Sequence, residues 1–295
     1  MVKILKQKLV LVRNFLIFKK YDFLAKANKT TFRVNPEANF VVSIASYPKR
    51  AYLLPAVYEA LNNQTTVPQK WLLVLSEEEW PNLELPNFLK KLKKRGLEII
   101  WVKNNTFAVK KLVPVIVKYP DLAVITFDDE LIYGKEVIKK LIDNSIKHKG
   151  AVIGHVGKQL IQKNGKLKMN YRTKDPANVN TPSAQVYFLG GSGTYYPSNS
   201  LDKRVIDNQA IHKIVPGRGS DIWFWAAALA NNTKQVCLGS KTDINLYFSV
   251  PTTEQTKPKD TPSSDNMEQR FQMAIDYFGI REKLLSILPD KKNKI

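Results

Sequence analysis

Three consecutive acidic residues, Asp128, Asp129 and Glu130, directly follow the short apolar run Ala123–Phe127. A run of this length, rich in β-favouring residues, is typical of a buried strand. The three carboxylates cannot be buried together without partners, because like charges raise each other's pKa and desolvation is costly. They are expected to emerge where the strand ends, opposite a positive charge. A divalent cation carrying a phosphorylated ligand is one candidate, since Mg²⁺ is held by one or two carboxylates plus substrate phosphates.

The first half of the chain alternates strand-like and helix-like segments from Asn39 onward. Strands are predicted at 40–45, 71–75, 97–102 and 123–127, and helices at 52–61, 88–95, 109–119 and 135–148. This alternation is typical of βαβ units and a largely parallel sheet. Ligands of such sheets bind at the carboxyl ends of the strands. One crevice is therefore expected among the segments that follow the strands, at 46–50, 76–79, 104–105 and 128–130.

The second half contains two loops with possible functional roles. Gly190–Gly193 lacks the spacing and the Lys-Ser/Thr pair of a Walker motif, and indicates either close backbone approach to a ligand or a plain tight turn. Pro216–Asp221 precedes an apolar run predicted to be a helix, with Ser220 or Asp221 as its N-cap. Capping alone would explain an aspartate there. A strand at 151–156, a hairpin at 158–169 turning at Asn164, a strand at 186–189, and a helix from about Asp265 with Glu268 in a capping box are also predicted.

The charge balance is strongly basic, with 46 Lys and Arg against 26 Asp and Glu and a formal net charge of +20. Such a chain attracts polyanions: nucleic acid, anionic lipid or phosphorylated substrates. The nucleic-acid interpretation depends on charge alone, because no recognisable nucleic-acid motif is present and the acids would repel phosphates without a metal. The single Cys237 excludes an internal disulfide and a cysteine-based zinc site, and fits a reducing compartment.

The N-terminal segment 1–38 interleaves lysines with apolar residues. Arg13 interrupts its apolar run and Lys19 and Lys20 close it, so neither a membrane span nor a signal peptide is predicted. A basic amphipathic helix on an anionic membrane and an ordinary helix packed on the domain fit the pattern equally well. Residues 281–295 are predicted to be a basic C-terminal tail.

In combination, five segments resemble the GT-A glycosyltransferases, specifically the family-two-like enzymes of bacterial capsule and lipopolysaccharide synthesis. Val41–Arg50 matches the family's opening strand and nucleotide loop, Ala60–Thr65 its helix end, and Ile125–Tyr133 its acidic metal motif. Ser220–Ala226 matches the segment that carries the base, and Ser264–Gln269 matches a late polar element. The resemblance covers roughly residues 39–279. Glu130 stands where relatives have Asp, Ser220 where they often have a first Asp, and Asp265-Asn266 inverts the usual order.

The resemblance implies a GT-A domain over 39–280, with a mainly parallel sheet flanked by helices. It implies transfer of a sugar from a nucleotide-diphosphate-sugar donor to a hydroxyl of a glycan or lipid-linked acceptor, assisted by Mn²⁺ or Mg²⁺, inverting, and in cell-surface polysaccharide synthesis. A cytoplasmic enzyme, peripheral on the inner face of the cell membrane, is expected. The alternative is a basic nucleic-acid- or membrane-binding protein without turnover.

The resemblance also implies roles for individual residues. Asp221 is the expected base, Asp129 and Glu130 are the expected metal contacts, and Glu130 is the more direct of the two. Donor contacts are expected from Ser46, Tyr47, Arg50, Lys110, Lys111, Asp128 and Asp129. Acceptor contacts are expected from Gly191, Tyr195 and Trp223, although core packing is the commoner role of such aromatic side chains.

Overall fold

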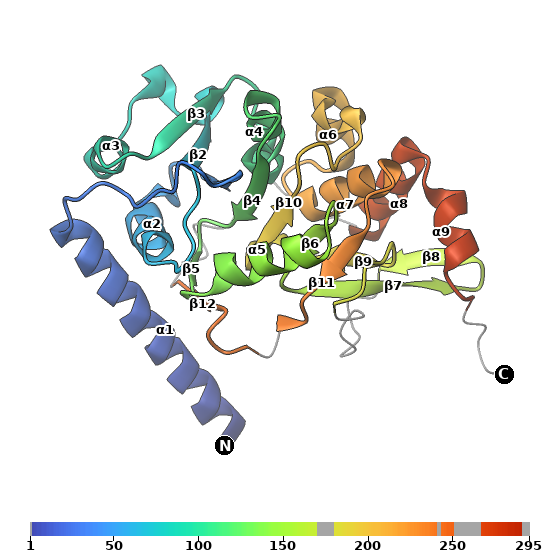
Figure 1. Ribbon diagram of the computed structural model, residues 1–295, viewed down its shortest axis with the longest axis horizontal. Coiled ribbons are helices and arrows are strands. Elements are labelled where there is room, and N and C mark those ends of the chain that lie inside the picture. The colour runs from blue at the N-terminus through green and yellow to red at the C-terminus, as the bar shows by residue number, and fades with distance from the viewer. Residues whose placement is uncertain (1, 170–179, 241–242, 251–266, 291–295) are drawn as a thin grey trace.

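The computed structural model describes residues 2–169, 180–240, 243–250 and 267–290 of the chain, and is built around one seven-stranded sheet (Figure 1). The strand order is β11-β6-β10-β4-β1-β2-β3. Along the chain these are β1 Phe40–Ala45, β2 Trp71–Ser76, β3 Glu98–Val102, β4 Ala123–Phe127, β6 Val152–Gly154, β10 Thr194–Tyr196 and β11 Gln235–Cys237. Neighbours pair in parallel except β10, which is antiparallel to β4 and β6. The predicted α/β class with a mainly parallel central sheet is confirmed.

Helices cover both faces of this sheet. One face packs against α2 Leu54–Asn62, α3 Asn87–Lys94 and α5 Val137–Lys147, and the other against α4 Val113–Lys118, α7 Ser220–Ala230 and α8 Met267–Phe278. Successive residues of a strand point to opposite faces, so in β1 Val41 joins one core while Val42 and Ile44 join the other. Burial on both faces explains why the strands are continuous apolar runs in the sequence.

Two smaller sheets complete the strand pairings of the described residues. β9 Val186–Phe188 and β8 Lys166–Met169 flank β7 Gly157–Lys163, and β12 Tyr247–Ser249 pairs with β5 Leu131–Tyr133. The predicted hairpin turn is present, because Asn164 and Gly165 have φ angles of 50° and 70° between β7 and β8. Two positive φ angles in sequence are what a tight two-residue hairpin turn requires.

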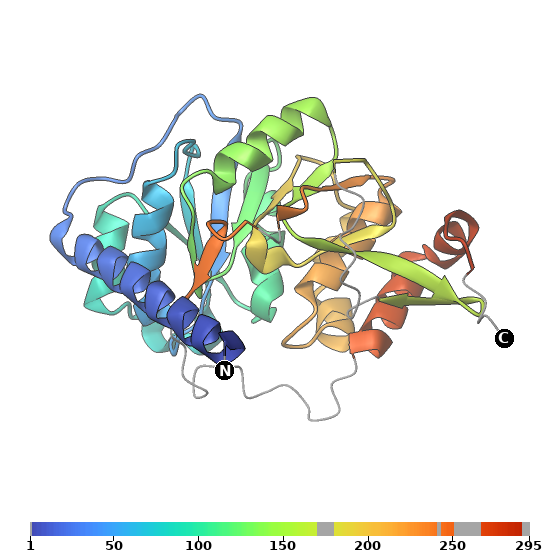
Figure 2. The same cartoon turned by 90° about the horizontal axis from the view of Figure 1, so that it is seen from below.

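The remaining helices lie at the periphery. α1 Val2–Ala27 runs along the outside of the domain beside α2 and β12, as Figures 1 and 2 both show. α6 Asn208–Ile214 precedes α7, and α9 Arg281–Ile287 follows α8. Residues 281–287, which the sequence analysis placed in a basic tail, thus form a helix whose Leu284 is fully buried in the core. The capping box predicted at Asp265 and the tail beyond residue 290 lie outside the described residues.

The helix predicted over 109–119 is divided in two. A short 3₁₀ turn, η4 Phe107–Lys111, precedes α4, which begins at Val113. Pro114 stands in the first turn of α4, where its missing N–H costs no hydrogen bond and its fixed φ suits the start of a helix. The separate 3₁₀ turn carries Lys110 and Lys111.

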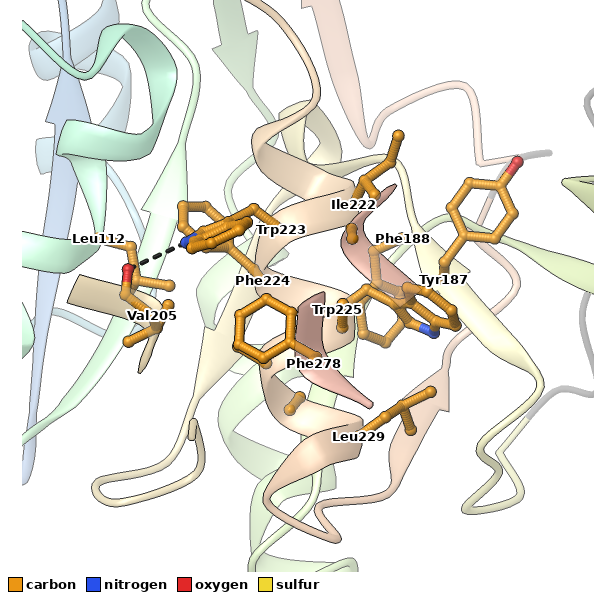
Figure 3. Packing of buried hydrophobic residues seen from close by; sticks show 14 of the residues in the cluster. Leu112, Tyr187, Phe188, Val205, Ile222, Trp223, Phe224, Trp225, Leu229 and Phe278 are labelled. Carbon is orange, nitrogen blue, oxygen red and sulfur yellow. Dashed lines mark hydrogen bonds between the residues drawn. The ribbon is translucent and has the colours of Figure 1, made fainter. Parts of the chain in front are cut away.

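Two aromatic residues predicted to contact an acceptor occupy the cores instead. Trp223 is fully buried in α7, where its Nε1 donates to the Val205 carbonyl at 2.9 Å (Figure 3). Its ring stacks on that of Tyr277. Tyr195 of β10 is buried on the opposite sheet face, in the core that α5 covers. Neither side chain reaches a surface where a sugar could stack, so the predicted acceptor contacts of Trp223 and Tyr195 are corrected to core packing.

The core position of Trp223 predicts a large loss of stability on truncation. Trp223→Ala should lower the free energy of unfolding by about 3–5 kcal/mol, as expected for loss of a buried aromatic ring. Trp223→Phe keeps a ring but leaves the Val205 carbonyl without its donor, and should cost about 1–3 kcal/mol. Urea denaturation measures both, with the exposed Tyr52→Ala as the control. A Trp223→Ala protein as stable as this control would contradict the core assignment.

Candidate active site

A cavity of about 470 Å³ lies at the carboxyl ends of the parallel strands. Its walls come from all four segments that the sequence analysis placed around one crevice, with further residues from η4 and the loop before α7. The lining residues that carry polar side chains are Ser46, Tyr47, Lys49, Arg50, Glu79, Asn105, Lys110, Lys111, Asp128 and Asp129. The structure therefore brings together the donor-binding residues predicted from the sequence, and it adds Glu79 and Asn105 as partners of Lys110.

Arg50 holds two of the three consecutive acids. Its guanidinium forms ion pairs of 2.9 Å with Asp129 Oδ1 and 2.9 Å with Glu130 Oε2. The second oxygen of Asp129 accepts a hydrogen bond of 2.6 Å from Ser46 Oγ. Burial raises the pKa of the Asp129 carboxyl, and the charge of Arg50 opposes this rise. Both oxygens of Asp129 thus have protein partners, whereas Glu130 uses Oε2 for Arg50 and remains about one third exposed (35%).

Lys110 and Lys111 approach the acids from η4, and both are almost completely buried. Lys111 Nζ donates to Asp128 Oδ1 at 2.8 Å, and Lys110 Nζ donates to Glu79 and, at 2.9 Å, to Asn105 Oδ1. Burial lowers the pKa of Lys110 even with Glu79 beside it. Burial also disfavours the charge of Lys111, but Asp128 and Asp221 more than compensate and its pKa is raised. Lys111 therefore stays protonated between two carboxylates.

Asp221 lies behind this group, in the first turn of α7. The N-cap of α7 is Gly219, which has a φ of 97° and no side chain that could cap the helix. The prediction that Ser220 or Asp221 caps the helix is thus wrong. Asp221 instead accepts a hydrogen bond of 3.0 Å from the Gly190 N–H through Oδ2. Burial raises the pKa of Asp221 above its ordinary value, and Lys111 and the Gly190 N–H oppose the rise.

The glycine-rich loop folds over two of the carboxylates. A Cβ on Gly190 would lie 2.4 Å from Asp221 Oδ1, and one on Gly191 would lie 2.6 Å from Asp128 Oδ2. Distances this short exclude any side chain at either position without displacement of an acid. The predicted close backbone approach is therefore present, and the groups approached are Asp128 and Asp221. Of the predicted acceptor contacts, Gly191 alone lies beside the acids.

Tyr133 joins the loop to the acidic segment, a role that the sequence analysis missed. Its buried hydroxyl donates to the Gly191 carbonyl at 2.7 Å and accepts from the Asp128 N–H at 2.8 Å. No sequence signal marks this contact, because Tyr133 and Gly191 are distant along the chain and meet only through the pairing of β10 with β4.

The chemistry of the acids suits a hard divalent cation. In the described part of the chain, no group of three or more His, Cys, Asp or Glu side chains converges on one point. A cation here would take one or two carboxylates and complete its coordination with oxygens of a bound ligand, as Mg²⁺ does in phosphate sites. Of the two expected metal contacts, Glu130 would be the better-placed ligand, because both oxygens of Asp129 are engaged by Arg50 and Ser46.

No protein-family model and no curated protein matches the chain. Among solved structures, the 1–349 fragment of S. aureus TarS in complex with UDP-GlcNAc is similar, with 12% identity and a TM-score of 0.48 over 82% of this chain and 66% of that chain. The same fragment in complex with UDP gives 13% identity and a TM-score of 0.48 over 82% and 65%. The chain thus spans just under two thirds of the length of these fragments.

The raised pKa of Asp221 predicts a pH-dependent cost to stability. The folded protein holds this proton more tightly than the unfolded chain, whose aspartate titrates near 3.8. Between the two pKa values the native state binds more protons, so the free energy of unfolding falls as pH rises. Asp221→Asn does not titrate and still offers an oxygen to the Gly190 N–H, so its stability relative to wild type should increase across this window and then level off.

Urea denaturation over a pH series from acid to neutral measures this difference. Asp221→Ala is the matched comparison, because it removes the charge and also the acceptor of the Gly190 N–H. It should be less stable than Asp221→Asn at every pH, by about 1–3 kcal/mol. Parallel pH curves for wild type and Asp221→Asn would show that burial does not shift this carboxyl.

Proposed function

We propose that the chain transfers a sugar from a nucleotide-diphosphate-sugar to a hydroxyl of a glycan or lipid-linked acceptor in cell-surface polysaccharide synthesis, in the cytoplasm. The observation that carries this proposal is a cavity beside the strand ends, lined by Asp128 and Asp129 together with Arg50, Lys110 and Lys111. Glu130 joins this group through its ion pair with Arg50, and Asp221 through its interaction with Lys111. The resemblance of the sequence segments to GT-A glycosyltransferases gives these residues their roles.

The basic residues suit a diphosphate. Arg50, Lys110 and Lys111 all line the cavity, and each is held by at least one carboxylate. A bound diphosphate would offer the same cations a second anionic partner, with charge-assisted hydrogen bonds from the lysines and a bidentate contact from Arg50. Ser46, Tyr47 and Asp128, on the same walls, are the proposed contacts to the nucleotide and its ribose.

Mn²⁺ or Mg²⁺, when bound, would neutralise the charge that develops on the leaving diphosphate. Glu130 is the proposed direct ligand, because one of its oxygens is not used by Arg50 whereas both oxygens of Asp129 have partners. Asp129 has a different part, since its carboxylate fixes Arg50 through Oδ1 and Ser46 through Oδ2. The chain's own cations then orient the donor phosphates around that position.

Asp221 is the proposed base that accepts the proton of the attacking acceptor hydroxyl. A raised pKa brings a carboxylate closer to the working range of a general base, and the charge of Lys111 favours its ionised form. The Gly190 N–H fixes the direction of the carboxylate. One base with direct displacement inverts the anomeric carbon, by the same logic that separates inverting from retaining glycosidases.

Metal-dependent donor binding tests the first half of the proposal. Calorimetric titration should show that UDP or another nucleotide diphosphate binds more tightly with Mn²⁺ than without it. Glu130→Ala and Asp128→Ala should reduce binding to the level without metal, whereas the exposed Glu136→Ala, outside the cavity, should bind like wild type. A protein that binds no nucleotide diphosphate, with or without metal, would contradict the proposal.

Turnover tests the second half. Asp221→Asn should bind the donor like wild type and transfer sugar about 10²–10⁴-fold more slowly, which is the usual contribution of a general base. Donor hydrolysis or transfer, screened across UDP-, GDP-, TDP- and CMP-sugars, supplies the assay. Full activity in Asp221→Asn would assign the base to another residue.

A further inference from the structure

Among the described residues, α1 contacts the domain through one of its sides. Asn14 and Phe18 are buried there and Tyr21 is half-buried, against α2 and β12. The Arg13 guanidinium lies 5.0 Å from the ring centroid of Phe248 in β12, which holds the helix at a second place. Figure 2 shows the helix lying across the outside of the domain, and none of the other described helices and strands lies over its far side.

The far side of α1 is apolar. Leu9, Val12, Leu16 and Phe23 are 61%, 55%, 61% and 69% exposed. Their spacing of three, four and seven residues places them in one stripe along an α-helix. Leu16 precedes Phe18 by two residues, which is roughly half a turn, so this stripe lies opposite the packed side. A stripe of four large apolar side chains exposed to water marks an interaction surface.

Basic residues border the stripe. Lys8, Lys19 and Lys26 are exposed along one edge and Lys20 along the other. Asp22 is the one acid in α1, and it pairs with Lys26 at 2.7 Å. The uncovered face is therefore an apolar strip bordered by lysines, defined here as the outer face of α1. Leu11 and Phe15, which are 68% and 45% exposed, extend the apolar surface beyond the edge formed by Lys8 and Lys19.

The charges on this face select its occupant. We propose that the outer face of α1 lies on an anionic lipid surface, with Leu9, Leu16 and Phe23 in the boundary between headgroups and acyl chains. Long lysine side chains at the edges reach the headgroups while their methylene stems remain among apolar groups. Anionic lipids also attract each basic residue near the surface. A second copy of the same face would set lysines against lysines, which argues against pairing of two α1 helices.

The helix lies along the surface and does not cross it. None of the helices in the described ranges is long and apolar enough to span a membrane. The two sides of α1 have different partners: the side with Asn14 and Phe18 packs on the domain, and the outer face lies on lipid. The two interpretations that the sequence leaves open are thus combined in one helix. Lipid binding by the outer face does not depend on the proposed sugar transfer, and it can be measured without a sugar donor.

Vesicle co-sedimentation of the full chain tests the proposal. Wild type should bind vesicles that contain phosphatidylglycerol and bind pure phosphatidylcholine vesicles weakly. Leu16→Glu with Phe23→Glu should weaken binding to the anionic vesicles by about tenfold or more, since each side chain contributes roughly the transfer free energy of a large apolar group. Ile146→Glu is the matched control, because Ile146 is 65% exposed on α5 and should leave binding unchanged.

A charge-reversal pair tests the lysine edges. Lys19→Glu with Lys20→Glu should weaken binding, and Lys90→Glu with Lys91→Glu, an equal charge change on α3, should weaken it much less. All substituted side chains are exposed, so thermal unfolding should remain close to that of wild type. The proposal is overturned if wild type does not bind anionic vesicles, or if the Leu16 and Phe23 variant binds as well as the Ile146 control. A dimer that this variant dissociates, without vesicle binding, would assign the outer face to a second copy.

Discussion

The site depends on one electrostatic constraint: carboxylates gathered at the end of a buried strand must be matched by buried cations. Asp129 is almost wholly enclosed and is satisfied by Arg50 and Ser46, while Lys111 stands between Asp128 and Asp221. An unpaired charge as deeply buried as Asp129 would cost several kcal/mol, so this carboxylate in particular requires its partners. The same arrangement leaves opposite charges at the wall of a cavity, where a charged ligand can exchange partners with them.

A second constraint is steric and belongs to the glycine-rich loop. Gly190 and Gly191 pass so close to Asp221 and Asp128 that a methyl group would overlap a carboxylate oxygen. The Tyr133 hydroxyl ties the loop to the segment after β4. β5, which contains Tyr133, pairs with β12, and the Val250 N–H after β12 donates to the Glu130 carbonyl at 3.1 Å. β12 also contacts α1, so the outer helix and the acidic segment are joined through one two-stranded ribbon.

Much of the first half of the fold could be predicted, because its strands are buried on both faces and its helices carry one apolar stripe. β1 was predicted to the residue, and the crevice at the strand ends followed from the parallel order. The second half was harder. β10 is three residues long and enters the sheet antiparallel, so Tyr195 and Tyr196 gave no pattern that distinguishes a central strand from a loop. Trp223 was misplaced because an apolar helix buried on all sides has no face that marks a site.

The sequence by itself determined which chemical groups are available: three acids after a buried strand, lysines two elements away, an aspartate after a flexible loop, and a basic apolar N-terminal helix. Local periodicity and charge are properties of neighbouring residues, so they can be read from the order of the chain. Tertiary structure alone decided which groups meet. It paired Arg50 with Asp129 and Glu130, turned Asp221 from a helix cap into a partner of Gly190, and packed one stripe of α1 while exposing the other. These outcomes depend on contacts between distant segments, and their energies exist only once the sheet has brought those segments together.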